Sequence, residues 1–506
     1  MDAHVLPAML AEHAPALLVA IPLFMSALVA AQPSGRAGYL IAVGSVLAAL
    51  LLAIELAFQV NTQGIVSYAL GGWEPPYGIE FRVDGLNAAV LLLLGAVGLA
   101  ALIFAGPSVA DEISRGKRSL FYSAFLICFS GLSGVAITGD AFNMFVFLEI
   151  SSISTYALIA MGHTNDRRAL TASFNYLVMG TIGATFFVIG VGFLYMATGT
   201  LNMADIAIRV AELDGNRVVE VAFAFIIVGV GLKAALFPLH LWLPNAYAFA
   251  PNFVTIFLAS TATKVAFYVL IRFMFDVFDP SSSFVSQAFT WVITPLAIAG
   301  MLIASVQASF QANVRRLLAY SSVAQVGYMM LGLGIGTAAG VSAGFLHLLN
   351  HAMMKGALFM ALATFALVYG IRRIEDFRGL GQLMPFTAAA FTIGALSLIG
   401  VPFTAGFISK FYLIQAALQS EWWWAVAAIV ISSVLAVAYM YRILAVMWVQ
   451  PPPEGAQAVE RRAPLLVLGP LWVLALANLY FGIDAGFLVW LSDTAAQAAI
   501  NGSVGS

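Results

Sequence analysis

Long apolar runs recur from one end of the chain to the other, and this feature limits the possible folds more than any other. Runs of about 18 or more apolar residues are candidates for membrane-spanning helices, because roughly 20 helical residues cross the hydrocarbon core. The composition agrees, since 62% of the 506 residues are hydrophobic and only 9% are charged. A soluble protein of this length would be far more polar. The sequence therefore predicts an all-α polytopic membrane protein.

The lengths of these runs predict about fourteen spans. The expected spans are residues 14–32, 37–60, 86–106, 119–138, 141–161, 170–197, 219–237, 252–274, 284–306, 317–338, 340–369, 385–418, 423–448 and 464–491. The run 385–418 is longer than one crossing needs and contains IGVPFTAG, so we expect a broken helix there. Residues 201–217 mix charged and apolar residues at helical spacing and are expected to lie along the membrane surface.

Basic residues are divided unequally between the two sets of alternate loops. One set holds fourteen, namely Arg36, Arg115, Lys117, Arg118, Arg167, Arg168, Arg315, Arg316, Arg372, Arg373, Arg378, Arg442, Arg461 and Arg462. The other set holds four, namely Arg82, Arg209, Arg217 and Arg272. Cytoplasmic loops are the basic ones, and an even number of spans puts both termini on one side. We therefore expect a multi-pass membrane protein with both termini outside the cytoplasm.

The four remaining basic residues are lysines inside predicted spans: Lys233, Lys264, Lys355 and Lys410. Lysine can lose its proton when it is buried, whereas arginine stays charged. Glu149 is the one acid near the middle of a span, so the four ammonium groups cannot all be charged together without a large penalty. Lysines that switch between charged and neutral forms would make a proton relay. The alternative is structural, because a single buried lysine can also reach the interface or pair locally.

The segment GFLHLLNHAMMKGALF, residues 344–359, places His347, His351 and Lys355 four residues apart on one stripe of a helix. Two histidines at this spacing could bind zinc, but Lys355 would repel a cation, and no further ligand follows at a suitable spacing. They could instead be packing residues with satisfied hydrogen bonds. We favour a polar bridge for protons, because imidazole titrates nearest to neutral pH and can both accept and donate. No metal or other cofactor is expected.

Two proline-containing breaks accompany the lysines. Pro238 follows Lys233 in LKAALFPLHLWLPNAYAFAP, and Pro402 precedes Lys410 in LIGVPFTAGFISKF. Proline frees a backbone carbonyl, and non-helical backbone at membrane depth survives only beside protein or water. Broken helices in corresponding halves indicate a repeat with an ion path between the halves. The order of break and lysine differs between the two segments, so the residues alone only suggest this repeat.

Across residues 80–450 the chain resembles the antiporter-like membrane subunits of Mrp-type cation/proton antiporters, respiratory complex I and energy-converting hydrogenases. Besides the Glu149 segment, the motifs that carry the resemblance are LKAALFPLHLWLPNAYAFAP, STATKVAFYVLIR, RRLLAYSSVAQVGYM, HLLNHAMMKGALF and GVPFTAGFISKF. The resemblance implies fourteen helices and two inverted five-helix repeats, with helices seven and twelve broken. The implied divisions are N-terminal helices 1–118, repeats 119–275 and 284–449, and a last helix in 463–506.

The resemblance also implies a role for each buried ionisable residue. The family's helix-five glutamate corresponds to Glu149, which pairs with the helix-seven lysine, here Lys233. The other positions on the implied proton path, from helix eight through the helix-eleven bridge to helix twelve near the exit, are Lys264, His347, His351, Lys355 and Lys410. Asn245 and Tyr247 stand where many relatives have an acid and a histidine, so the entry of protons from the cytoplasm is not explained by the motif.

Within the family, WLPNAYAFAP and TKVAFYVLIR look most like the D-type subunit of the Mrp antiporter. The resemblance therefore implies a proton-translocating subunit of the bacterial inner (plasma) membrane. We expect it to work with other membrane subunits, with protons and, in an antiporter, Na⁺ as its ions. The alternatives are a pump subunit of complex I (NADH-quinone oxidoreductase) or of a membrane-bound hydrogenase, a single-chain solute carrier, and a structural scaffold. The chain lacks a cysteine cluster and a phosphate-binding glycine motif, so we do not expect it to be the redox catalyst. Its net charge of -2 gives no reason to expect nucleic-acid binding.

Overall fold

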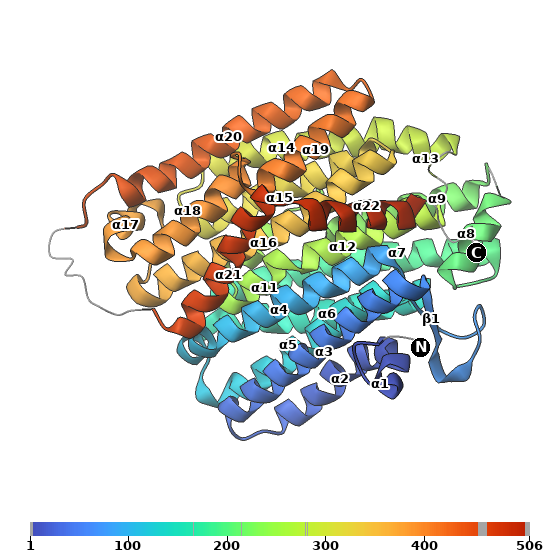
Figure 1. Ribbon diagram of the computed structural model, residues 1–506, viewed down its shortest axis with the longest axis horizontal. Helices are drawn as coiled ribbons and strands as arrows, with labels where there is room; N and C mark the ends of the chain where they lie inside the picture. The colour runs from blue at the N-terminus through green and yellow to red at the C-terminus, as the bar shows by residue number, and fades with distance from the viewer. Residues whose placement is uncertain are drawn as a thin grey trace.

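The computed structural model describes residues 4–164, 166–213, 215–278, 280, 282–453 and 463–500. This part of the chain is almost entirely helical, with a single two-stranded sheet (Figure 1). Eleven of its helices are long and apolar enough to cross a membrane, and the shorter helices Ala14–Ala30 and Pro385–Ile399 are also apolar. The predicted all-α polytopic membrane fold is therefore confirmed.

The described residues form fourteen spans in the predicted order, ten of them continuous. The continuous spans are α2 (Ala14–Ala30), α3 (Gly35–Gln63), α4 (Gly85–Glu112), α5 (Arg118–Ile137), α6 (Ala141–Ala160), α7 (Arg168–Thr198), α15 (Val314–Gly334), α16 (Ala338–Tyr369), α20 (Trp423–Trp448) and α21 (Leu465–Ile483). The interrupted spans are α9 (Arg217–Lys233) with α10 (Leu243–Phe249), α11 (Asn252–Ser260) with α12 (Ala262–Ile271) and the π-helical turn η4 (Arg272–Val277), α13 (Ser283–Ala288) with the π-helical η5 (Phe289–Ile293) and α14 (Thr294–Ser309), and α18 (Pro385–Ile399) with α19 (Ala405–Gln419).

Short elements connect the spans. They are α1 (Ala8–Glu12), the antiparallel strands β1 (Val66–Ala69) and β2 (Glu80–Val83), η1 (Leu70–Gly72), η2 (Arg115–Lys117), η3 (Met161–Thr164), α8 (Met203–Ala211), η6 (Ile374–Phe377), α17 (Leu380–Leu383) and α22 (Gly486–Ile500). Helix α8 lies in the segment that we expected at the membrane surface. It buries Met203, Ile206 and Val210 and exposes much of its other face, as an amphipathic helix does.

The C-terminal span differs from the prediction. The expected run 464–491 is not one helix, because α21 ends at Ile483 and a separate helix, α22, begins at Gly486. Asp484 has an extended backbone, and its Oδ1 accepts a hydrogen bond from the Gly486 N–H at 3.1 Å. An aspartate that caps backbone N–H groups favours the start of a new helix. Helix α22 then packs against α16 and α4 (Figure 1).

Both described ends of the chain lie at the same end of the molecule as the hairpin β1–β2 (Figure 1). His13 Nδ1 lies 3.1 Å from Tyr68 Oη of β1. Thr494 of α22 lines a pocket together with Arg82 of β2. At the opposite end, Arg168 and Arg372 line one pocket. Arg82 of one predicted set of loops and Arg168 and Arg372 of the other thus lie at opposite ends of the molecule. Arg461 and Arg462 lie outside the described residues. The side that faces the cytoplasm and the domain limits stay predictions.

Candidate functional site

The first helix break places a lysine against the central acid. Helix α9 ends at Lys233, and its Leu232 carbonyl accepts a hydrogen bond from Trp242 Nε1 at 2.9 Å, beyond Pro238. The Lys233 ammonium donates to Glu149 Oε1 at 3.3 Å and to the Ser152 hydroxyl, both on α6. The break therefore ends the helix where a buried cation can meet a carboxylate from a neighbouring span.

The second break gives its lysine a different set of partners. Helix α18 ends at Ile399, the segment 400–404 with Pro402 is not helical, and α19 carries Lys410. Lys410 Nζ donates to the Leu398 and Ile399 carbonyls at 3.1 and 2.9 Å and to Ser433 Oγ at 3.1 Å. The C-terminal end of a helix is its negative end, which stabilises a cation.

This geometry explains why the order of break and lysine differs in the sequence. Lys233 is the last residue of the half-helix α9, and the Lys410 ammonium reaches back to the last carbonyls of the half-helix α18. Both lysines therefore lie at the C-terminal end of the first half of a broken helix. The equivalence is spatial and cannot be read from the spacing of the motifs.

Lys264 lies beside an interruption that the sequence did not predict. Thr261 has φ −128° and ψ −57°, which separates α11 from α12 within the expected span 252–274. Lys264 is buried, and its Nζ donates to the Ala259 carbonyl and, at 3.4 Å, to Thr263 Oγ1. As at the second longer break, where Lys410 bonds the Leu398 and Ile399 carbonyls, the lysine beside the interruption binds a backbone carbonyl.

The stripe His347, His351 and Lys355 on α16 is completely buried. His347 Nδ1 lies 2.9 Å from Ser409 Oγ, and its Nε2 lies 2.8 Å from Gln325 Oε1. The His351 ring is parallel to that of His347, with 6.3 Å between the ring centroids. Within the described residues, neither nitrogen of His351 has a hydrogen-bond partner.

Lys355 forms its hydrogen bonds with α15. Its Nζ donates to the Leu318 carbonyl at 2.8 Å and to Ser321 Oγ at 2.5 Å. Lys264 is buried on α12, and both α11 and α12 pack against α16, which carries the stripe. The stripe therefore lies against the helices that flank Lys264, on the side of the first half.

Tyr328 joins the stripe to the second break. Its ring centroid lies 5.4 Å from that of His347, and Lys410 Nζ lies 4.7 Å from the same tyrosine ring. His351, His347, Tyr328 and Lys410 thus follow one another through the buried interior, and Ser409 lies next to Lys410 on α19. The Lys233–Glu149 pair is separate from this line: no hydrogen bond in the described residues joins Lys233 to Lys264, although α9 and α12 pack together.

The structure bears on the interpretations of the histidine stripe. None of its three side chains faces lipid, because all of them are buried. No group of three or more potential metal ligands occurs among the described residues, which leaves the zinc interpretation without a ligand set. A packing role would require satisfied nitrogens, and the described structure provides these for His347 but not for His351.

Sequence reasoning missed the polar residues that hold the relay side chains. Lys233, Lys355 and Lys410 each donate a hydrogen bond to a different serine. Each of these serines belongs to a Ser–Ser pair within an apolar span. The three pairs are Ser151–Ser152, Ser321–Ser322 and Ser432–Ser433. These pairs are visible in the sequence and could have marked the helices that face the lysines.

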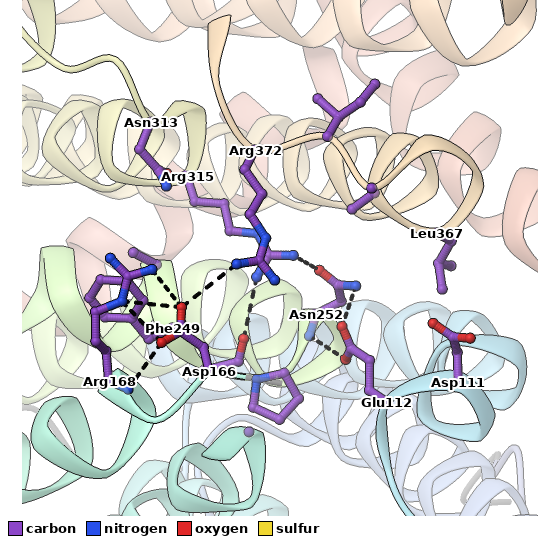
Figure 2. A pocket seen from close by; sticks show the side chains of 17 residues that line it. Asp111, Glu112, Asp166, Arg168, Phe249, Asn252, Asn313, Arg315, Leu367 and Arg372 are labelled. Atoms are coloured by element: carbon purple, nitrogen blue, oxygen red, sulfur yellow. Dashed lines mark hydrogen bonds and ion pairs between the residues drawn. The ribbon is translucent and has the colours of Figure 1, made fainter. Parts of the chain in front are cut away.

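A charged pocket of about 450 Å³ opens at the arginine-rich end of the molecule (Figure 2). Arg168 donates to Asp166 at 2.6 Å, and this hydrogen bond lowers the pKa of the Asp166 carboxyl. The pocket is formed by segments from both halves of the chain, and its charged lining residues are Asp111, Glu112, Asp166, Arg168, Arg315 and Arg372.

Asn252, the first residue of α11, connects charges of opposite sign in this pocket (Figure 2). Its backbone N–H and Nδ2 donate to the two carboxylate oxygens of Glu112 at 2.8 and 2.5 Å. Its Oδ1 accepts a hydrogen bond from Arg315. The inner wall of the pocket is therefore the junction between α10 and α11, which leads towards Lys264 along α11 and α12.

Comparisons with known proteins agree with this arrangement. The family model described as "NADH:quinone oxidoreductase/Mrp antiporter, TM" matches residues 138–436. "NADH-quinone oxidoreductase subunit N" of Desulforudis audaxviator is 40% identical, over 93% of this chain and 96% of that protein. The D-type subunit of the Na(+)/H(+) antiporter of Bacillus subtilis is 31% identical, over 88% of each chain. A chain in the structure of the Mrp complex from a Dietzia species superposes with a TM-score of 0.88 at 28% identity, covering 97% of this chain and 98% of that one.

Proposed function

Because this chain belongs to the NADH:quinone oxidoreductase/Mrp antiporter family, we propose that it carries protons through the membrane part of a multi-subunit complex. The proton path consists of Lys264, His351, His347 and Lys410, with Lys355 beside it. The observation that supports it best is the unbroken burial of these side chains between two helix breaks. Ionisable groups inside a membrane are costly and usually mark ion paths.

The two partners of His347 suit a group that gains and loses a proton. Gln325 Oε1 can only accept, so the neutral imidazole carries its hydrogen on Nε2, and Nδ1 accepts from Ser409. The Ser409 hydroxyl also lies 3.2 Å from the Gly406 carbonyl. When Nδ1 takes up a proton, the Ser409 hydroxyl can turn its hydrogen to that carbonyl and accept from the imidazolium. Both charge states of His347 are therefore accommodated without moving the backbone.

Glu149 has the separate role of holding Lys233 in its charged form. The ion pair lies at the first helix break, and a carboxylate at this distance favours the charged ammonium. A change in this pair would alter the electrostatic potential at Lys264, because α9 packs against α12. We assign the charged pocket to the cytoplasmic side, as the basic loops indicate, and regard residues 119–275 and 284–449 as the two repeats that the path crosses.

The complex that we propose for this chain is an Mrp-type Na⁺/H⁺ antiporter, with the chain in the place of the D-type subunit. The relative from Bacillus subtilis and the Dietzia Mrp structure support this proposal by covering nearly the whole chain. The second candidate is a redox-driven complex, which the relative named NADH-quinone oxidoreductase subunit N favours by its higher identity. Purification of the intact complex tests the choice. Proton movement that responds to Na⁺ without an electron donor supports the antiporter, and movement that requires a donor supports the redox pump.

Lys264→Ala tests the proton path itself. The complex with this variant should assemble, because Lys264 bonds only neutral oxygens and its loss leaves no buried partner charge unpaired. Proton transport, measured with a pH-sensitive dye in liposomes that contain the purified complex, should be lost. Normal transport by the assembled variant would refute the path, whereas a scaffold role predicts that the variant impairs assembly instead of transport.

A further inference from the structure

A second pocket, of about 360 Å³, adjoins the charged pocket at the arginine-rich end of the molecule. The two pockets share Arg168 and Arg372, both labelled in Figure 2. The second pocket is lined by four arginines, Arg168, Arg316, Arg372 and Arg373, and by no acidic residue. We call it the arginine pocket. Its lining differs from that of the charged pocket, where arginines and carboxylates are mixed.

Backbone contacts hold the four arginines together from separate parts of the chain. Asn313 and Arg373 form an isolated antiparallel bridge, which keeps the segment of Arg372 and Arg373 beside the start of α15. Arg316 lies in the first turn of α15, and its backbone N–H donates to Asn313 Oδ1 at 3.1 Å. Arg168 belongs to α7 in the first half. The pocket therefore combines four cationic side chains with the positive N-terminal end of a helix.

The described residues do not neutralise these four charges. Asp166 contacts two of the arginines, at 2.6 and 3.8 Å, and Asp376 accepts from two backbone N–H groups of the segment 372–373. Four cations thus meet two carboxylates, which leaves two positive charges. Arg316 and Arg373 form no ion pair with the described part of the chain, and Arg316 Nε is buried there without a hydrogen-bond partner. A buried donor of this kind needs an acceptor from outside these residues.

Beyond the arginine pocket, three partly exposed side chains follow one another along α10. Phe249 lines the pocket, and its ring centroid lies 4.5 Å from the Arg168 guanidinium carbon. Asn245 and Leu241 precede Phe249 at intervals of four residues, or about 6 Å per step. Leu241 lies in the first helix break and is 66% exposed. Because α10 packs against α7 and α15, this stripe runs over the outer surface from the arginines to the break. Cations, an amide and an apolar side chain match the order of groups in a phospholipid.

We propose that the arginine pocket binds the phosphate group of an anionic phospholipid, whose acyl chains lie along α10 as far as the first helix break. Arginine matches phosphate oxygens with two parallel hydrogen bonds, and basic pockets between membrane helices bind anionic headgroups. A lipid fits better than free phosphate, because the stripe from Phe249 to Leu241 provides contact for its chains. Asn245 stands where many relatives have an acid, and an acid there would repel the phosphate. The site is separate from the proposed proton path.

Lipid titration of the purified complex tests the site. The complex is stripped of lipid in a neutral detergent, phosphatidylglycerol is added, and native mass spectrometry counts the bound lipids. Arg316→Gln/Arg373→Gln should weaken binding at the tightest site about thirtyfold, because each basic residue near a headgroup contributes roughly a factor of five. This variant should assemble, since neither arginine leaves a carboxylate partner in the described residues. The control Arg115→Gln/Lys117→Gln removes the same charge from an exposed turn at the same end and should bind the lipid normally.

Asn245→Asp provides a second test, because it keeps the shape of the side chain and adds a negative charge below the phosphate. It should weaken phosphatidylglycerol binding several-fold. Unchanged affinity in either assembled variant would overturn the site, and so would an equal loss in the control. Failure of both variants to assemble would show that these side chains serve the fold, and would also overturn it.

Two other ligands separate the lipid from its alternatives. Phosphatidylcholine, which has no net charge, should bind the tightest site about tenfold more weakly than phosphatidylglycerol. Equal binding of the two lipids would overturn the role of the arginines. Inorganic phosphate should not displace the lipid at equal concentration, because it lacks acyl chains. Displacement at equal concentration would identify a site for free phosphate and overturn the proposed lipid site.

Discussion

Replacing Gln325 with leucine should slow proton transport about tenfold without preventing assembly of the complex. Gln325 Oε1 lies 2.8 Å from His347 Nε2 and is the acceptor for its N–H. Leucine has a similar size, so packing on α15 changes little, but the buried N–H loses its acceptor. An unsatisfied buried donor costs about 1–3 kcal/mol.

The cost falls more heavily on the charged form of His347, because hydrogen bonds from charged donors are roughly twice as strong as neutral ones. The protonated intermediate is therefore raised by about 1–1.5 kcal/mol relative to the neutral form. Since about 1.4 kcal/mol corresponds to a tenfold change in rate, transport should fall by that factor.

The initial rate of proton transport by the purified complex in liposomes measures this effect. Thr364→Val is the matched control, because Thr364 is also buried and lies on α16, but it donates only to the Met360 carbonyl of its own helix. The reasoning is refuted if Gln325→Leu transports at the rate of this control while assembling normally.

Three further predictions follow from the breaks and the helix packing. Glu149→Gln and Lys233→Ala should each abolish proton transport in an assembled complex, because the ion pair at 3.3 Å is lost, and a near-normal rate in either would exclude the pairing. Lys410→Arg should also be inactive, because arginine keeps a positive charge but does not release a proton, so normal activity would mean that fixed charge suffices. Gly229→Ala should lower the free energy of unfolding of the complex in detergent by about 1–3 kcal/mol, because the added Cβ would lie 2.6 Å from the Gly183 carbonyl oxygen. The control Gly192→Ala, whose Cβ would meet nothing within 4 Å, should leave the free energy of unfolding unchanged.

The fold was predictable because each span needs enough apolar residues to cross the membrane and each loop carries its own charge pattern. The prediction failed where a local side-chain interaction changes the backbone. Asp484 caps a new helix after α21, and Thr261 interrupts the helix before Lys264, although hydropathy continues through both positions. The length of an apolar run shows whether a segment can cross the membrane, but it does not show where the helix within that segment is interrupted.

The site was predictable in its ionisable residues and unpredictable in its connections. Lysines and histidines in apolar spans are conspicuous because they are costly there. Their partners are serines, a glutamine, a tyrosine and backbone carbonyls. These groups occur throughout the chain, so the sequence alone does not show which of them bind the ionisable residues. Tyr328 and Ser409, which bring His347 and Lys410 together, became apparent only when α15, α16 and α19 were seen side by side.

Proton transport by the His351→Leu variant tests the account most directly. His351 is completely buried, and within the described residues its nitrogens have no hydrogen-bond partner, so leucine leaves no polar group orphaned and should preserve or raise stability. The account predicts a complex that assembles, unfolds at the same or a higher temperature and no longer transports protons. A complex with His351→Leu that assembles and transports protons at the normal rate would contradict the proposed path between Lys264 and Lys410.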